Sequence, residues 1–163
     1  MDADIVAERK AQELTSGNAF AVFNHLEVEH VEPDYAVFKL AIRPESKNPR
    51  GFVHGGLLAG MADNAAGYAA HSDGRTYVTQ SSHMNYLHNQ AEGVIRASGR
   101  VLHRGRTICL VRVDITNESG ALLATGEVSY FCVDRYIGRV FSNTCTRRAP
   151  VPVKAGACAS FGI

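Results

Sequence analysis

The chain has 163 residues, of which 45% are hydrophobic, and its 17 basic and 16 acidic side chains give a formal net charge of +1. These values are typical of one soluble globular domain with its own hydrophobic core. The balanced charge gives no indication of a polyanion-binding surface, although it leaves a local basic patch open. The absence of Trp argues against stacking platforms for single-stranded nucleic acid. We therefore expect no nucleic-acid partner.

The first third of the chain predicts a helix followed by a hairpin. Residues 2–16 carry a weakly amphipathic helix pattern. Residues 19–26 form a short apolar patch, which we interpret as a turn that packs under a sheet. Apolar and polar residues then alternate on both sides of Pro33-Asp34, so we expect a β-hairpin with strands near residues 25–32 and 35–43.

The centre of the chain predicts one long helix, and the remainder predicts strands. A polar loop with Pro and Gly leads into a helix that ends near His71. Four strands joined by turns follow, at residues 76–87, 93–104, 107–117 and 121–133. This order predicts an α+β fold in which an antiparallel sheet wraps around the helix. We place the domain at residues 1–133 and a loosely ordered extension at residues 134–163.

Cysteines and apolar segments point to a reduced protein without a membrane span. The four cysteines are Cys109, Cys132, Cys145 and Cys158; none has the C-x-x-C spacing of a zinc or redox motif. Cys109 and Cys132 fall in apolar strand patterns, so they are predicted to be buried, whereas Cys145 and Cys158 could pair. No segment has signal-peptide character or approaches about 18 uninterrupted apolar residues. We expect a cytoplasmic protein without a metal site, because the histidines lack ligand spacing.

The helix over residues 55–71 is made almost entirely of Gly, Ala, Leu and Met, so it should be buried. Its glycines would weaken an isolated helix by about 1 kcal/mol each, so packing must stabilise it. Asp63 is conspicuous there, because a buried carboxylate needs a partner or a purpose. One interpretation is that Asp63 caps a neighbouring element or pairs with an arginine.

A second interpretation is catalytic. Gly55 and Gly56 at the helix start leave backbone N–H groups free, and these could polarise a carbonyl as an oxyanion hole does. Asp63 lies about 13 Å further along the helix than His54. That is too far for one reacting atom within a subunit, so the site would form between two subunits.

These residues carry a family resemblance. The pattern N-x5-H-G-G-x6-D-N, formed by Asn48, His54, Gly55, Gly56, Asp63 and Asn64, resembles the hotdog-fold acyl-CoA thioesterases of the phenylacetate-degradation and thioesterase-superfamily-member-2 type. The resemblance covers roughly residues 20–133. It implies a homodimer with a continuous sheet, commonly doubled to a homotetramer. It also implies an acyl-CoA substrate and no separate cofactor.

The resemblance implies a role for each residue of the pattern. Gly55 would donate its N–H to the thioester carbonyl, and His54 would hold that loop. Asn48 would bond near the carbonyl or the attacking water. Asp63 of the other subunit would be the nucleophile or the general base. Thr79 would position water, with Ser81 or Ser82 as alternatives if the register differs.

Substrate contacts are implied as well. They would come from Gly56, Leu57 and Asn64, and from Arg104 and Arg106, which suit CoA phosphates but could equally be a solvated hairpin tip. Leu57, Leu58 and Met61 would line the acyl pocket. The extension and the extra His83 and His88 depart from the family pattern.

Two other functions remain open from the sequence. A hotdog hydratase or dehydratase would need a His and an acid aligned across a Cα–Cβ bond. A catalytically silent acyl-CoA-binding module would bind CoA esters without turnover. Release of free thiol from acyl-CoA separates both from a thioesterase.

Overall fold

The computed structural model describes residues 15–134. The helix predicted for residues 2–16 and the extension predicted for residues 134–163 fall almost entirely outside this range, as do Cys145 and Cys158. The described elements are α2 (Ala19–Phe23), β1 (Glu27–Glu32), β2 (Tyr35–Ala41), the 3-10 turn η1 (Pro44–Ser46), α3 (Gly55–His71), β3 (Tyr77–Tyr86), β4 (Val94–Arg104), β5 (Ile108–Asn117) and β6 (Leu122–Cys132).

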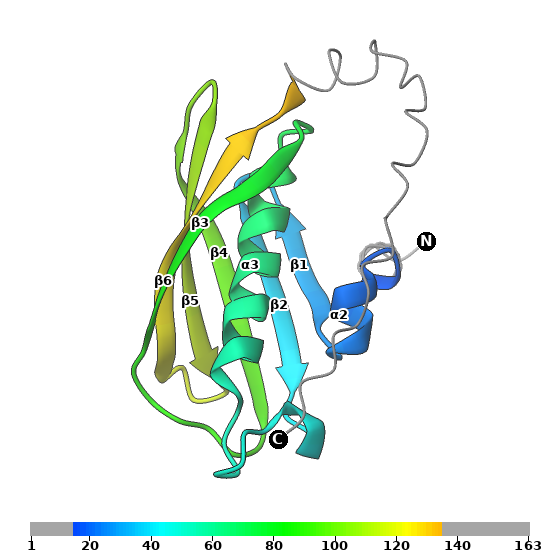
Figure 1. Ribbon diagram of the computed structural model, residues 1–163, viewed down its shortest axis with the longest axis vertical. Helices are drawn as coiled ribbons and strands as arrows, with labels where there is room; N and C mark the ends of the chain where they lie inside the picture. Colours follow the sequence, from blue (N-terminus) through cyan, green and yellow to red (C-terminus); the bar gives the residue numbers. More distant parts are fainter. Residues whose placement is uncertain (1–14, 135–163) are drawn as a thin grey trace, which may run out of the picture.

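The six strands form one antiparallel sheet in the order β1-β2-β4-β5-β6-β3. The sheet curves around α3, which lies along its inner face (Figure 1). This confirms the predicted α+β fold, and the predicted strand limits agree with the observed ones to within about two residues. In this arrangement β1 and β3 are the edge strands.

The segment at residues 19–26 differs from its prediction. We expected a turn, but Ala19–Phe23 forms the short helix α2, capped by Asn18, whose side chain accepts a hydrogen bond from the N–H of Ala21. Five helical residues are too few to show a helical period, so the capping residue was the usable signal. The ring of Phe20 packs from α2 against α3 at Gly60.

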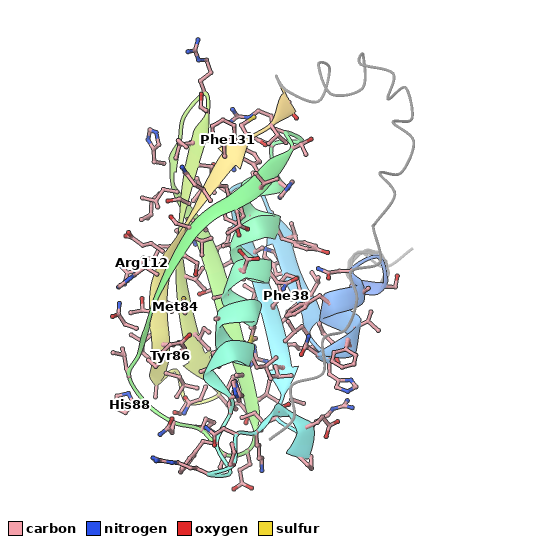
Figure 2. The ribbon with its side chains drawn as sticks, in the orientation of Figure 1. Phe38, Met84, Tyr86, His88, Arg112 and Phe131 are labelled. Carbon is pink, nitrogen blue, oxygen red and sulfur yellow. The ribbon has the colours of Figure 1, made fainter. Side chains whose placement is uncertain are left out.

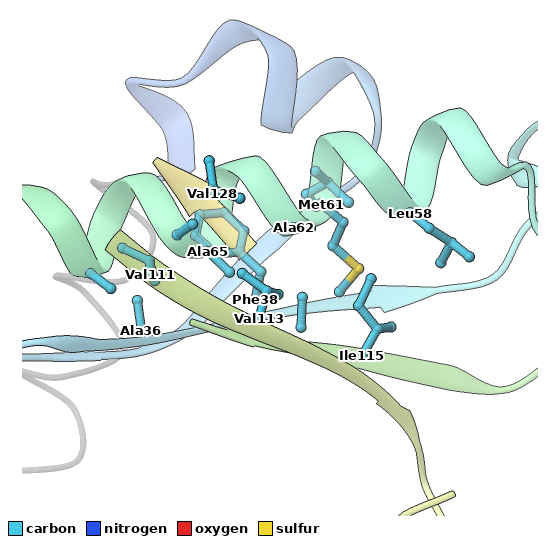
Figure 3. Packing of buried hydrophobic residues seen from close by; sticks show 14 of the residues in the cluster. Ala36, Phe38, Leu58, Met61, Ala62, Ala65, Val111, Val113, Ile115 and Val128 are labelled. Atoms are coloured by element: carbon cyan, nitrogen blue, oxygen red, sulfur yellow. The ribbon is translucent and has the colours of Figure 1, made fainter. Parts of the chain in front are cut away.

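Small side chains let α3 lie very close to the sheet. Its buried residues are Leu58, Met61, Ala62, Ala65, Ala66, Ala69 and Ala70. They pack on large residues of the strands, among them Phe38, Val111, Val113, Ile115 and Val128 (Figure 3). Gly99 of β4 lies at a point of close approach, since a Cβ atom there would lie 2.7 Å from the carbonyl oxygen of Ala65. The predicted burial of the helix is confirmed.

Two further predictions concern burial. Cys109 and Cys132 are free and buried, as expected for small apolar side chains. Burial raises the pKa of the Cys109 thiol, which keeps it protonated.

Within residues 15–134, no helix is long and apolar enough to span a bilayer.

Candidate active site

The loop before α3 is fixed by Asn48. Its side-chain oxygen accepts hydrogen bonds from the N–H groups of Arg50, at 2.9 Å, and Phe52, at 3.3 Å. Its backbone bonds to Phe52 and Gly51 close the same turn, and Gly51 has a φ of 84°, a conformation that glycine adopts easily. Because Oδ1 faces two donors, the amide Nδ2 of Asn48 points away from the turn. It has no hydrogen-bond partner within the described range.

The first turn of α3 leaves one donor unpaired. His54 is the N-cap, and its Nδ1 accepts the N–H of Gly56 at 2.9 Å. The N–H groups of Leu57 and Leu58 bond to the carbonyl of His54. Gly55 is therefore the residue of this turn whose N–H has no partner in the part of the chain that the structure describes. The expectation that the N–H of Gly56 is also free is wrong, because the His54 imidazole occupies it.

A hollow opens around the end of β3. It has a volume of about 330 Å³ and is lined by Tyr86, Leu87, His88 and Asn89, at the end of β3. Figure 2 shows Tyr86 and His88 near the end of β3 that is level with the start of α3. The ring of Tyr86 lies beside Gly55, since a Cβ atom on Gly55 would meet it at 3.8 Å. One residue of the hollow's lining is therefore adjacent to Gly55.

Asp63 is held by hydroxyl groups and not by a cation. The Thr79 hydroxyl donates to its Oδ1 at 2.9 Å. The Tyr130 hydroxyl lies 3.0 Å from the same oxygen and 2.8 Å from the backbone carbonyl oxygen of Asp63. Among residues 15–134, Asp63 makes no ion pair and its Oδ2 accepts no hydrogen bond. The interpretation that it pairs with an arginine or caps a neighbouring element finds no support there.

The sheet brings the two hydroxyls together. Thr79 of β3 and Tyr130 of β6 are directly paired across the strands, and the register shifts between Thr79 and Ser81. Such a bulge re-aims side chains. Thr79, and not Ser81 or Ser82, is therefore the residue that contacts Asp63. Tyr130 was not predicted as a site residue; its place in the alternating pattern of β6 indicated an inward-facing side chain but not its partner.

Both polar atoms of the Asn64 side chain bond to other residues of the chain. Its Nδ2 donates to the carbonyl of Gly60 at 2.8 Å, and its Oδ1 accepts from Nδ2 of Asn18 at 2.7 Å. These bonds attach the N-cap of α2 to α3. A substrate contact of Asn64 stays a prediction. Leu58 and Met61 are buried in the core, and Leu57 packs partly against it.

Arg104 is the last residue of β4, and its guanidinium lies against the C-terminal end of α3. Its guanidinium donates to the carbonyls of Ala69 and Ala70, to Asp34 and to the hydroxyl of Tyr77, and it forms an ion pair with Asp73. All three of its nitrogens therefore have partners inside the chain, and a cation here suits the negative end of the helix. A phosphate contact of Arg104 stays a prediction.

Asp73 and Arg106, which lie near Arg104 in space or in sequence, differ in whether they have partners in the chain. Burial raises the pKa of Asp73, but hydrogen bonds from Arg75 and Tyr77 and the charge of Arg104 outweigh it, so that this pKa lies below its ordinary value of 3.8. Arg106 is exposed and has no partner among the described residues, so its guanidinium is available to a ligand.

Comparisons of the sequence and the structure with known proteins identify the family. A sequence model of the thioesterase superfamily matches residues 50–124. A hypothetical thioesterase from Streptococcus pneumoniae TIGR4, solved with coenzyme A, is 30% identical over 75% of this chain and 96% of its own, with a TM-score of 0.68. The chain belongs to the thioesterase superfamily. Its sheet and helix are the hotdog fold, and the protein is a thioester hydrolase.

Two other similar proteins carry the name PaaI. A variant of the phenylacetic acid degradation protein PaaI from Thermus thermophilus is 28% identical, with a TM-score of 0.67, over 71% of this chain and 99% of that one. The acyl-coenzyme A thioesterase PaaI of Escherichia coli K12 is 24% identical over 119 residues, which are 72% of this chain and 85% of that protein.

Proposed function

We propose that the protein hydrolyses acyl-CoA thioesters to a free acid and CoA. The observation that carries the proposal is Asp63, a carboxylate without a cationic partner in the described structure, with its Oδ2 unoccupied on an otherwise apolar helix. The names of the E. coli PaaI and of the CoA-bound streptococcal thioesterase support CoA as the thiol of the substrate.

Each group has a distinct part in the reaction. The N–H of Gly55 donates to the thioester carbonyl oxygen and stabilises the negative charge that develops there. Asp63 either attacks the carbonyl carbon through Oδ2, or removes a proton from a water that attacks it. The C–S bond then breaks and CoA leaves as its thiol. Water supplies the oxygen and the two protons that the products gain. The free amide of Asn48 can bond to the carbonyl or the water.

The two groups belong to different subunits in this proposal. Gly55 and Asp63 are eight residues apart on one helix, or about 12 Å along its axis. One carbonyl cannot contact both. Strand β3 is an edge strand of ten residues, most of them exposed, and such an edge is a template for pairing with a second copy. A dimer joined there would bring the α3 helices of the two copies near each other.

The first test measures free thiol released from a panel of acyl-CoAs of varied chain length and aryl content. Asp63→Asn keeps the shape of the side chain, so the variant should fold while its kcat falls by orders of magnitude. Normal turnover by a folded Asp63→Asn protein would overturn the proposal. Acyl-CoA converted without thiol release would indicate a hydratase instead.

The second test asks whether the site crosses subunits. Gly55→Pro and Asp63→Asn protomers are mixed by joint unfolding and refolding. If Gly55 of one subunit acts with Asp63 of the other, each mixed dimer contains one intact site, and about a quarter of the parent activity should return at random reassortment. A mixture that stays as inactive as its components would place both groups in one subunit.

A further inference from the structure

The arrangement around Asp63 contains one residue that the proposed function does not use. Tyr130 is 2% exposed, and its hydroxyl lies within hydrogen-bond distance of two oxygens of Asp63. One is the backbone carbonyl and the other is Oδ1 of the carboxylate. The single phenolic proton is shared between them, so Tyr130 links the side chain of Asp63 to its own backbone.

The same carboxylate oxygen also accepts from Thr79. A carboxylate oxygen has two lone pairs, and on Oδ1 both face a hydroxyl donor. Oδ2 is the oxygen left for chemistry. The two donors stand opposite each other on neighbouring strands, so the sheet itself sets their spacing.

Tyr130 can act only as a donor towards Asp63. Burial, and next the charge of Asp63, raise the pKa of Tyr130 well above its ordinary value of 10.0, so the phenol stays protonated. Its ring cannot easily turn away, because it is packed between β6 and α3, where a Cβ atom on Gly67 would meet the hydroxyl oxygen at 3.5 Å.

We propose that Tyr130 is a positioning residue for Asp63: together with Thr79 it fixes Oδ1 and so makes Oδ2 the reacting oxygen. This proposal rests on the proposed function, because it assumes that Asp63 acts on the thioester. A carboxylate free to rotate would present either oxygen, and much of the time neither at the angle the carbonyl requires.

The test compares two buried tyrosines. Tyr130→Phe removes only the hydroxyl from beside Asp63. Tyr77→Phe is the matched control, because Tyr77 is also buried and hydrogen-bonded, but to Asp73 and Arg104. A bond to a charged group is involved, so kcat of Tyr130→Phe should fall on the order of ten- to a hundredfold with KM unchanged. Tyr77→Phe should lower the melting temperature and leave kcat near that of the parent.

The outcomes separate this inference from the proposed function. If Asp63→Asn is inactive but Tyr130→Phe keeps the parent kcat, Asp63 is the catalytic group and Tyr130 does not position it. If Tyr130→Phe and Tyr77→Phe lose kcat and stability in parallel, the phenol is a packing residue and the inference fails. If Asp63→Asn itself is active, the proposed function fails first.

Discussion

The most direct probe of the oxyanion donor is Gly55→Pro. Proline has no N–H, so the change deletes the donor that we assign to the thioester carbonyl. Gly55 is the first helical residue after the N-cap, which is where proline is favoured in helices. The preceding His54 has φ −68° and ψ 130°, the extended conformation that a residue before proline prefers. The backbone can therefore accept the ring.

The expected effect is large on turnover and small on stability. Loss of one oxyanion donor lowers kcat by about a hundred- to a thousandfold in enzymes of acyl transfer. The free energy of unfolding should change by about 1 kcal/mol or less, because no hydrogen bond to the Gly55 N–H exists among the described residues to be lost. Gly55→Ala is the control: it retains the N–H, and its methyl group would meet the Tyr86 ring at an ordinary 3.8 Å.

The assay is thiol release at saturating acyl-CoA, with thermal melts of all three proteins. We expect Gly55→Ala to remain active and Gly55→Pro to be nearly inactive, with similar melting temperatures. If the proline variant is folded and matches the alanine variant in kcat, the backbone N–H of Gly55 does not stabilise the transition state.

Three further changes test the fold around the site. Gly99→Ala would place a methyl group 2.7 Å from the backbone oxygen of Ala65. Overpacking of about 1–3 kcal/mol should outweigh the modest gain from replacing a strand glycine, and urea melts should show this loss of stability. The pKa of Asp73 is lowered in the folded protein, so the ionised carboxylate stabilises the fold above pH 3.8, and this stabilisation is lost as the pH falls below 3.8. The melting temperature of Asp73→Asn should therefore be lower than the parent's at neutral pH. The difference between the two melting temperatures should close as the pH falls below 3.8. Asn64→Ala should lower the free energy of unfolding by about 1 kcal/mol with KM unchanged, whereas a raised KM would show that Asn64 contacts the substrate.

The sheet and the long helix were predictable because their signals are local. Period-two alternation gave the strands to within about two residues, and the Gly- and Ala-rich composition identified α3 as a buried helix. Thr79 could be placed near Asp63 from the resemblance. Its hydrogen bond to Oδ1 of Asp63 could not be predicted, because the sequence does not show the β-bulge between Thr79 and Ser81.

The missed features depend on contacts between distant segments. Arg104 bonds to Asp34, 70 residues away, and to the last turn of α3, so its position at a hairpin tip said nothing about its partners. Tyr130 meets Asp63 across 67 residues. The free N–H of Gly56 was predicted wrongly for a local reason, since a histidine seldom serves as the N-cap and its ring nitrogen accepts that proton here.

Contacts at three points along α3 fix its position on the sheet. Close packing at Gly99 fixes its middle to the sheet, Arg104 binds the carbonyls of its last turn, and His54 caps its first. A helix held at three points cannot bend Gly55 towards Asp63, so their spacing of about 12 Å is a fixed property of the subunit. A thioester that needs both groups must then meet them on two different helices, which is why we expect the exposed edge of β3 to be as necessary for turnover as Asp63 itself.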